Sequence, residues 1–149
     1  MSKVKVLVFI CLLVVGQGAF PDDSPEAILQ RGLYLSDLYN WTVARPYLIQ
    51  AQQLFEAKGD QRNALYAQLA AIRAGVHPIP LPERSYKLAH ELATNPILQS
   101  DVELRMYCLA VKGELDGEID NAAMRRDWTE VNKLAHDLNN AKWQYRALG

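Results

Sequence analysis

The chain has 149 residues, enough for one domain with a hydrophobic core. Half of the residues are hydrophobic and 22% are charged, as in ordinary globular proteins. Because the formal net charge is only −1 and no long run of like charges occurs, the composition argues against a nucleic-acid or other polyanionic partner.

Residues 1–19 have the pattern of a secretory signal peptide. Lys3 and Lys5 form a positively charged start, residues 6–15 are an unbroken apolar run, and residues 16–19 bring the small side chains of a cleavage site. A buried strand or core helix is less favoured, because paired lysines would then open a core element. The apolar run is also well short of the roughly 20 residues that cross a bilayer. We therefore expect an exported protein, periplasmic or extracellular, with no stable membrane span after cleavage.

Export leaves the mature chain with one cysteine, Cys108, since Cys11 lies within the signal peptide. A lone cysteine cannot form an intrachain disulfide. Cys108 belongs to a helical stripe with Leu104, Val111 and Leu115, so we expect a buried structural thiol rather than a nucleophile.

The first expected helix covers residues 25–39. Ser24 is placed to cap it, Pro25 suits its first position, and Glu26 suits its first turn. Gly32 lies mid-helix, where glycine costs about 1 kcal/mol relative to alanine. A glycine at such a position indicates close contact with another helix.

A second helix is expected to open at Trp41 and end near residue 58. Its apolar residues recur at helical spacing, and small residues on that stripe let another helix approach closely. We predict that Ala44 and Ala51, together with Ala89 of a later helix, are buried where helices cross. Pro46 is assigned to the region of the first turn, where a missing N–H matters least.

A tight turn and a stiff connector separate the next helices. Gly59 can take the left-handed conformation that ends a helix, and Asp60 can cap a third helix that runs to about residue 74. Residues 76–82 carry prolines at alternate positions, which favours an extended spacer over a proline-rich ligand motif. Pro82 suits the start of a fourth helix, which ends at Asn95.

Capping patterns place the remaining helices. Ser100 and Glu103 form a capping box for a fifth helix, and Asp127 and Glu130 repeat that logic for a sixth. These helices and a final helical segment cover residues 101–115, 127–138 and 141–149.

Short segments recur along the chain. Residues 87–92 (Lys-Leu-Ala-His-Glu-Leu) are similar to residues 133–138 (Lys-Leu-Ala-His-Asp-Leu), which indicates degenerate repeats. Together with its helix-packing positions, this pattern resembles the tetratricopeptide repeat (TPR) superfamily, in particular MalT-like TPR regions. The residues that match those positions are Gly32, Ala44, Leu48 and Ala51.

The resemblance implies an all-α fold, a right-handed α-α superhelix of antiparallel helix pairs behind the signal peptide. It is closest over residues 26–75. Leu35 replaces the usual aromatic residue near the end of the first helix of a pair, and no closing proline follows Phe55. The TPR-like domain would cover residues 20–149 and be incomplete at its C-terminus, because a terminal capping helix is missing.

Motifs of catalysis and cofactor binding are absent from the sequence. His77, His90 and His136 have no metal-ligand spacing, and no phosphate-binding loop or nucleophile motif occurs. The carboxylates of Asp116, Glu118 and Asp120 lack the spacing of a calcium loop, so a solvated turn is the favoured interpretation. We expect neither an enzyme nor a cofactor.

The expected function is a non-enzymatic scaffold that binds a protein or peptide outside the cytoplasm. The alternative is the sensory or regulatory part of a longer signalling protein or enzyme whose active domain lies downstream. In TPR arrays the first helix of each pair lines the concave face, which the resemblance assigns to residues 25–39, 61–74 and 101–115. The basic residues on these helices, our candidate partner-binding set, are Arg31, Arg62, Arg73, Arg105 and Lys112.

We hypothesise that this face binds an acidic or carboxylate-bearing peptide, with Arg73 and Arg105 making forked contacts to carboxylates. The alternative, which we favour, is that these arginines are solvated or pair within the chain. Their partners would then be Asp101, Glu103 and Glu114.

Overall fold

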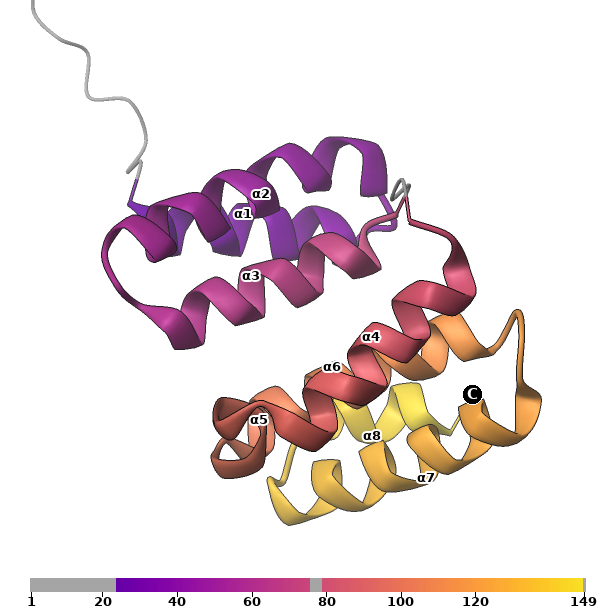
Figure 1. Ribbon diagram of the computed structural model, residues 1–149. Helices are drawn as coiled ribbons and strands as arrows, with labels where there is room; N and C mark the ends of the chain where they lie inside the picture. Colours follow the sequence, from indigo (N-terminus) through magenta and orange to yellow (C-terminus); the bar gives the residue numbers. More distant parts are fainter. Residues whose placement is uncertain (1–23, 76–78, 149) are drawn as a thin grey trace, which may run out of the picture.

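The computed structural model describes residues 24–75 and 79–148, and within these ranges every regular element is an α-helix (Figure 1). The eight helices are α1 (Pro25–Asp37), α2 (Trp41–Ala57), α3 (Gln61–Arg73), α4 (Leu81–Thr94), α5 (Pro96–Ser100), α6 (Val102–Asp116), α7 (Asn121–Asp137) and α8 (Ala141–Ala147). The expectation of an all-α chain is confirmed for this part. The expected signal peptide and much of the proline-rich connector lie outside the described residues. None of the described helices combines the length and apolar character needed to span a bilayer.

The predicted caps of the first and third helices are confirmed. The Ser24 hydroxyl accepts a hydrogen bond from the backbone N–H of Ala27, and Pro25 occupies the first helical position. The Asp60 carboxylate accepts from the backbone N–H of Asn63, at 3.1 Å. Each cap satisfies a backbone donor that the helix itself leaves unpaired.

One turn geometry recurs at three helix junctions. A residue with positive φ ends the helix, and the residue after it becomes the N-cap of the next helix. The positive-φ residues are Tyr39, Gly59 and Asn139. In each case the following N–H donates back to a carbonyl five residues earlier: Asn40 to Leu35, Asp60 to Phe55, and Asn140 to Ala135. This is the Schellman motif, which turns the chain sharply and makes consecutive helices antiparallel. The sequence predicted the turn only at Gly59.

The expected start of the fifth helix is wrong by one residue. Asp101, not Ser100, caps α6, because the Asp101 carboxylate accepts from the Leu104 N–H at 2.8 Å. Ser100 instead ends α5, a short helix that the sequence analysis did not predict, and its hydroxyl bonds the Pro96 carbonyl. Asn95 caps α5 through the Ile97 N–H.

The expected start of the sixth helix is also wrong. Helix α7 begins at Asn121, since the Asp120 carboxylate accepts from the N–H groups of Ala122 and Ala123. Asp127 lies in the middle of this helix and binds Lys112 instead of capping.

The proline of α2 lies further from the start of the helix than the sequence predicted. Pro46 is beyond the first turn of a helix that starts at Trp41. The carbonyl that loses its partner there belongs to Thr42, and both residues are exposed, so water can satisfy it.

The crossing of α1 and α2 depends on small residues. A Cβ at Gly32 would lie 2.6 Å from Cδ2 of Leu48, so the predicted close contact is confirmed. Ala44 and Ala51 are fully buried, as predicted. The prediction for Ala89 is wrong: it is half-buried and borders a hollow beside Tyr86. Helix α4 turns Leu88 into the core instead.

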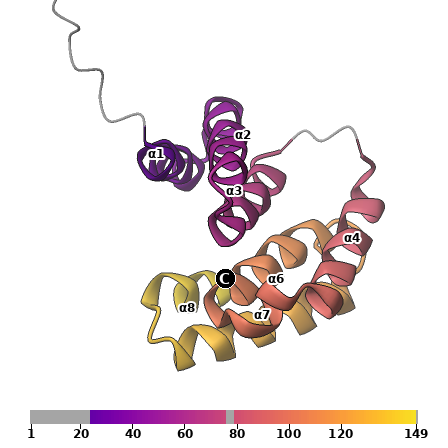
Figure 2. The same cartoon turned by 60° about the vertical axis from the view of Figure 1, so that its left-hand side comes forward.

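The helices pack mainly on their neighbours in sequence. Helices α1, α2 and α3 lie side by side in order, and so do α6, α7 and α8, while α4 and α5 pack on α6 (Figures 1 and 2). Helix α3 also packs on α6 and connects the two groups.

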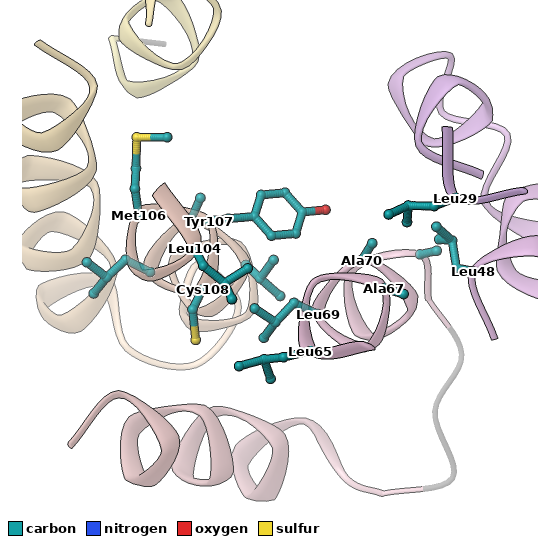
Figure 3. Packing of buried hydrophobic residues seen from close by; sticks show 14 of the residues in the cluster. Leu29, Leu48, Leu65, Ala67, Leu69, Ala70, Leu104, Met106, Tyr107 and Cys108 are labelled. Atoms are coloured by element: carbon teal, nitrogen blue, oxygen red, sulfur yellow. The ribbon is translucent and has the colours of Figure 1, made fainter. Parts of the chain in front are cut away.

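The core continues across α3 from one group to the other. Leu65 and Leu69 of α3 face Leu104 and Cys108 of α6, while Ala67 and Ala70 lie on the side of α3 toward Leu29 and Leu48 (Figure 3). Cys108 is completely buried, as predicted, and burial raises the pKa of its thiol to about 12. A thiol in this state is inert at neutral pH.

Candidate functional site: an aromatic pocket on the inner helices

A pocket of about 310 Å³ opens where α1, α3, α6 and α8 meet. Three of these helices are those expected to line the inner face, and α8 is the fourth. Four aromatic rings and four charged side chains dominate the wall of this inner pocket: Tyr34, Tyr66, Tyr107, Trp143, Asp37, Arg73, Lys142 and Arg146.

Arg73 is the most enclosed cation of the inner pocket. It ends α3, and its side chain is only 6% exposed. The guanidinium donates two hydrogen bonds to the Glu114 carboxylate of α6, one from Nε to Oε2 at 2.8 Å and one from Nη2 to Oε1 at 2.8 Å. The rings of Trp41 and Trp143 lie 5.1 Å and 5.9 Å from its central carbon. A forked ion pair between two indole rings fixes the guanidinium in place.

A second ion-pair group joins the two ends of the described chain. Asp37 at the end of α1 accepts from Lys142 at 2.6 Å and from Arg146 at 2.9 Å, both on α8. Burial alone would raise the pKa of Asp37, but the hydrogen bonds from these two cations outweigh it and hold the pKa below its ordinary value. The carboxylate therefore stays ionised and holds α8 near α1.

Two polar groups of the inner pocket are buried without a partner. Neither the Tyr107 hydroxyl nor Nη1 of Arg146 has a hydrogen-bond partner among the described residues, although the Arg73 guanidinium lies close enough to that hydroxyl to lower its pKa. Tyr107 is 5% exposed, and its ring packs edge-on against Tyr66 at 4.8 Å and Trp143 at 5.7 Å. Burial raises the pKa of Tyr107, so its hydroxyl keeps its proton and can donate.

These features suit an anionic ligand. Three cations, Arg73, Lys142 and Arg146, meet two carboxylates, Asp37 and Glu114, which leaves one positive charge in excess. Buried donors without partners carry a desolvation cost of about 1–3 kcal/mol each. A ligand oxygen that accepted from both of them would recover that cost.

Of the predicted basic residues, only Arg73 lines the inner pocket. Arg73 pairs with Glu114, one of the partners that the favoured alternative named, and Arg62 binds Asp101 at 2.6 Å and Glu103 at 3.3 Å.

The other three predicted basic residues are scattered. Arg31 lies over the Tyr47 ring, with its central carbon 4.8 Å from the ring centroid. Arg105 is half-buried and in no ion pair with the described residues. Lys112 binds two carboxylates, Asp116 on α6 and Asp127 on α7. Binding of a partner by these residues stays a prediction.

The sequence analysis missed most of the residues that form the inner pocket. Tyr107 was not among the residues assigned to the apolar stripe of its helix, and Trp143 and Arg146 belong to a final segment that was given no role. A usable signal existed: Trp143 and Arg146 share one helix face at i, i+3 spacing, with an aromatic and a basic side chain together.

A second polar cluster connects α4, α6 and α7. The Ser85 hydroxyl donates to Asp116, and Lys112 donates to Asp116 at 2.6 Å and to Asp127 at 2.8 Å. Desolvation lowers the pKa of Lys112, but the two carboxylates raise it further, so the amine stays protonated. A protonated lysine cannot serve as base or nucleophile, and the cluster is best understood as structural. In the described residues no group of His, Cys, Asp and Glu could hold a metal ion.

Comparison with known proteins identifies no relative, because neither a family model nor a curated protein nor a solved structure matches the chain.

Proposed function

We propose that the chain is a non-enzymatic scaffold that binds a protein or peptide outside the cytoplasm. In this proposal the helix pairs form a TPR-like solenoid with right-handed superhelical order. The support is the sequential packing of α1–α3 and α6–α8, the repeated Schellman turns, and the packing positions of the TPR resemblance. Export is supported by the signal-like pattern of residues 1–19.

The inner pocket is the proposed peptide site, and it would hold a carboxylate. The observation that carries this is the pair of unpartnered buried donors, on Tyr107 and Arg146, in one pocket with excess positive charge. A carboxylate that reached these donors would form charge-assisted hydrogen bonds, which are the strong ones. The surrounding rings would take an apolar or aromatic side chain of the same peptide, since aromatic residues and arginine are enriched at binding hot spots.

The test compares peptides on an array, each present with a free C-terminal carboxylate and as the amide. We expect the parent chain to retain selected free-acid peptides, and Tyr107→Phe to bind those peptides at least about tenfold more weakly. Tyr107→Phe removes only the unpartnered hydroxyl, so its thermal stability should equal or slightly exceed that of the parent. The matched control is Tyr86→Phe, because Tyr86 is 78% exposed and does not line the inner pocket. Equal capture of acid and amide forms, or equal binding by Tyr107→Phe and the parent, would refute the carboxylate site.

A further inference from the structure

A second hollow, the α2–α4 groove, lies between α2, α3 and α4. It encloses about 240 Å³ and shares no lining residue with the inner pocket. It exists because α4 packs on α5 and α6, while α3 packs on α2 and α6, so α3 and α4 are not closely packed on each other. Its floor is aliphatic: Ile49, Leu65, Leu69, Ile72, Ile79 and Leu88.

The walls of the α2–α4 groove are basic on both sides. Arg45 lies on the α2 wall, and Arg84 and Lys87, three residues apart, lie on the α4 wall. Among the described residues, Glu91 supplies the one carboxylate of the lining, and it accepts a hydrogen bond from the Asn95 amide at 2.9 Å.

These cations differ from Arg62 and Arg73 of the inner face, because no carboxylate of the described residues pairs with them. Among the described residues, none of Arg45, Arg84 and Lys87 is in an ion pair. Nε of Arg84 is buried and has no hydrogen-bond partner in the same part of the chain. Arg62 and Arg73, by contrast, hold carboxylates of this chain. The groove therefore offers positive charge to a ligand in addition to the single excess charge of the inner pocket.

We propose that the α2–α4 groove binds an acidic amphipathic helix of a partner protein. An aliphatic floor between two basic walls is complementary to an apolar stripe with carboxylates along both edges. A helix presents that pattern when apolar residues recur at i, i+4 and i+7 and acidic residues flank them, whereas a strand sends alternate side chains to opposite faces.

The size of the groove points to the same occupant. Pockets that enclose a drug-sized molecule hold about 300–1,000 Å³, and this groove is smaller. It has room for one or two aliphatic side chains of a segment that lies across it. The charges then determine which segments bind and how fast they associate.

The probe is a synthetic amphipathic peptide of about 15 residues, long enough to form a helix on binding. It carries leucines at i, i+4 and i+7 with glutamates on both flanks. Two further probes are the same peptide with lysine in place of each glutamate, and laurate as a single-chain fatty acid. Binding to the full chain is followed by the isoleucine methyl signals in NMR, because isoleucines lie both inside and outside the groove.

We expect the acidic peptide to shift the methyl signals of Ile49 and Ile72 and to leave those of Ile28, Ile97 and Ile119 in place. The variant Arg84→Glu/Lys87→Glu should weaken binding at least about tenfold. The matched control Arg125→Glu/Arg126→Glu reverses two exposed charges on α7, and it should bind as the parent does.

Three outcomes would overturn the proposal. The first is no binding of the acidic peptide at millimolar concentration. The second is equal binding of the lysine peptide, or of laurate in its place. The third is a response confined to isoleucines outside the α2–α4 groove. The carboxylate test on the inner pocket uses Tyr107, so either proposal can fail without the other.

Discussion

Gly32→Ala tests the close crossing of α1 and α2 with a single methyl group. The added Cβ would lie 2.6 Å from Cδ2 and 2.8 Å from Cγ of Leu48, and 3.4 Å from its backbone nitrogen. The shortest of these separations falls about 0.8 Å short of an ordinary 3.4 Å contact. Leu48 is fully buried, so its side chain has no free space into which to move.

Two opposing effects set the magnitude. Alanine is better than glycine in a helix interior by about 1 kcal/mol. Forcing an extra methyl group into a filled core costs about 1–3 kcal/mol. Because the side chain of Leu48 is enclosed and its backbone also stands close, we expect the upper part of that range and a net loss of about 1–2 kcal/mol. For a domain of this size that lowers Tm by about 4–8 °C.

The assay is urea denaturation of a double-mutant cycle with Leu48→Ala. Leu48→Ala alone should cost about 2–5 kcal/mol. In that background Gly32→Ala should no longer destabilise and should gain roughly 0.5–1 kcal/mol from helix propensity. The coupling energy between the two sites is then about 2 kcal/mol.

The control is Gly117→Ala, where the added Cβ would be 3.4 Å from its nearest neighbours and φ is −55°. It should change stability by less than about 0.5 kcal/mol. Additive effects of Gly32→Ala and Leu48→Ala, or a Gly32→Ala variant as stable as the parent, would show that α1 and α2 do not cross at this distance.

Three further substitutions test other parts of the structure. Ala51→Arg places a charge in a fully buried helix contact and should cost about 3 kcal/mol or more in a thermal melt, whereas the exposed neighbour Gln53→Arg should cost little. Lys112→Met leaves the buried Asp116 and the partly buried Asp127 without their cation and should cost about 3–5 kcal/mol in urea, against no measurable loss for the exposed Lys133→Met. Hydrogen bonds from a backbone and a side-chain N–H lower the pKa of Asp60 below 3.8, so its stabilisation is present above that pH and is lost as pH falls through the folded-state pKa. Asp60→Asn keeps the cap and should therefore lose less stability than the parent on going from pH 7 to pH 3; an equal loss would contradict this assignment.

The elements that the sequence predicted well are those with a complete local signal. Ser24, Gly59 and Asp60 act on backbone groups within a few residues of themselves. Such interactions depend little on the rest of the fold, so their pattern is sufficient. The small residue Gly32 was equally informative, because a mid-helix glycine is unfavourable unless another helix needs the space.

The errors arose where two local signals competed. Both Asp120 and Asp127 are followed by a helical apolar pattern, and local preference cannot rank them. The packing of Met124 beside the Gly117 turn and the ion pair of Lys112 with Asp127 decide for the earlier start. Gly117 and Lys112 lie outside α7, so both contacts are tertiary interactions.

The inner pocket shows the same limit over longer distances. Arg73 was recognised as an inner-face residue, and Glu114 was named as a possible partner. Asp37, by contrast, meets Lys142 and Arg146 only because α8 returns to α1, more than one hundred residues later in the chain. No periodic pattern in the sequence predicts that α8 lies beside α1.

The two proposed sites are distinguished from other basic residues such as Arg73 by polar groups that have no partner in the described part of the chain. The number of basic residues distinguishes them less clearly. Helices α3 and α6 face each other, so a cation such as Arg73 finds a carboxylate of its own chain, and a ligand would have to displace Glu114 to use it. That exchange gains little, because one forked ion pair replaces another. The buried donors of Tyr107 and Arg146 have no such competitor, and neither have Arg84 and Lys87 in the α2–α4 groove. Binding energy should therefore come from groups that the fold leaves unsatisfied, and variants of those groups should affect binding more than variants of Arg73.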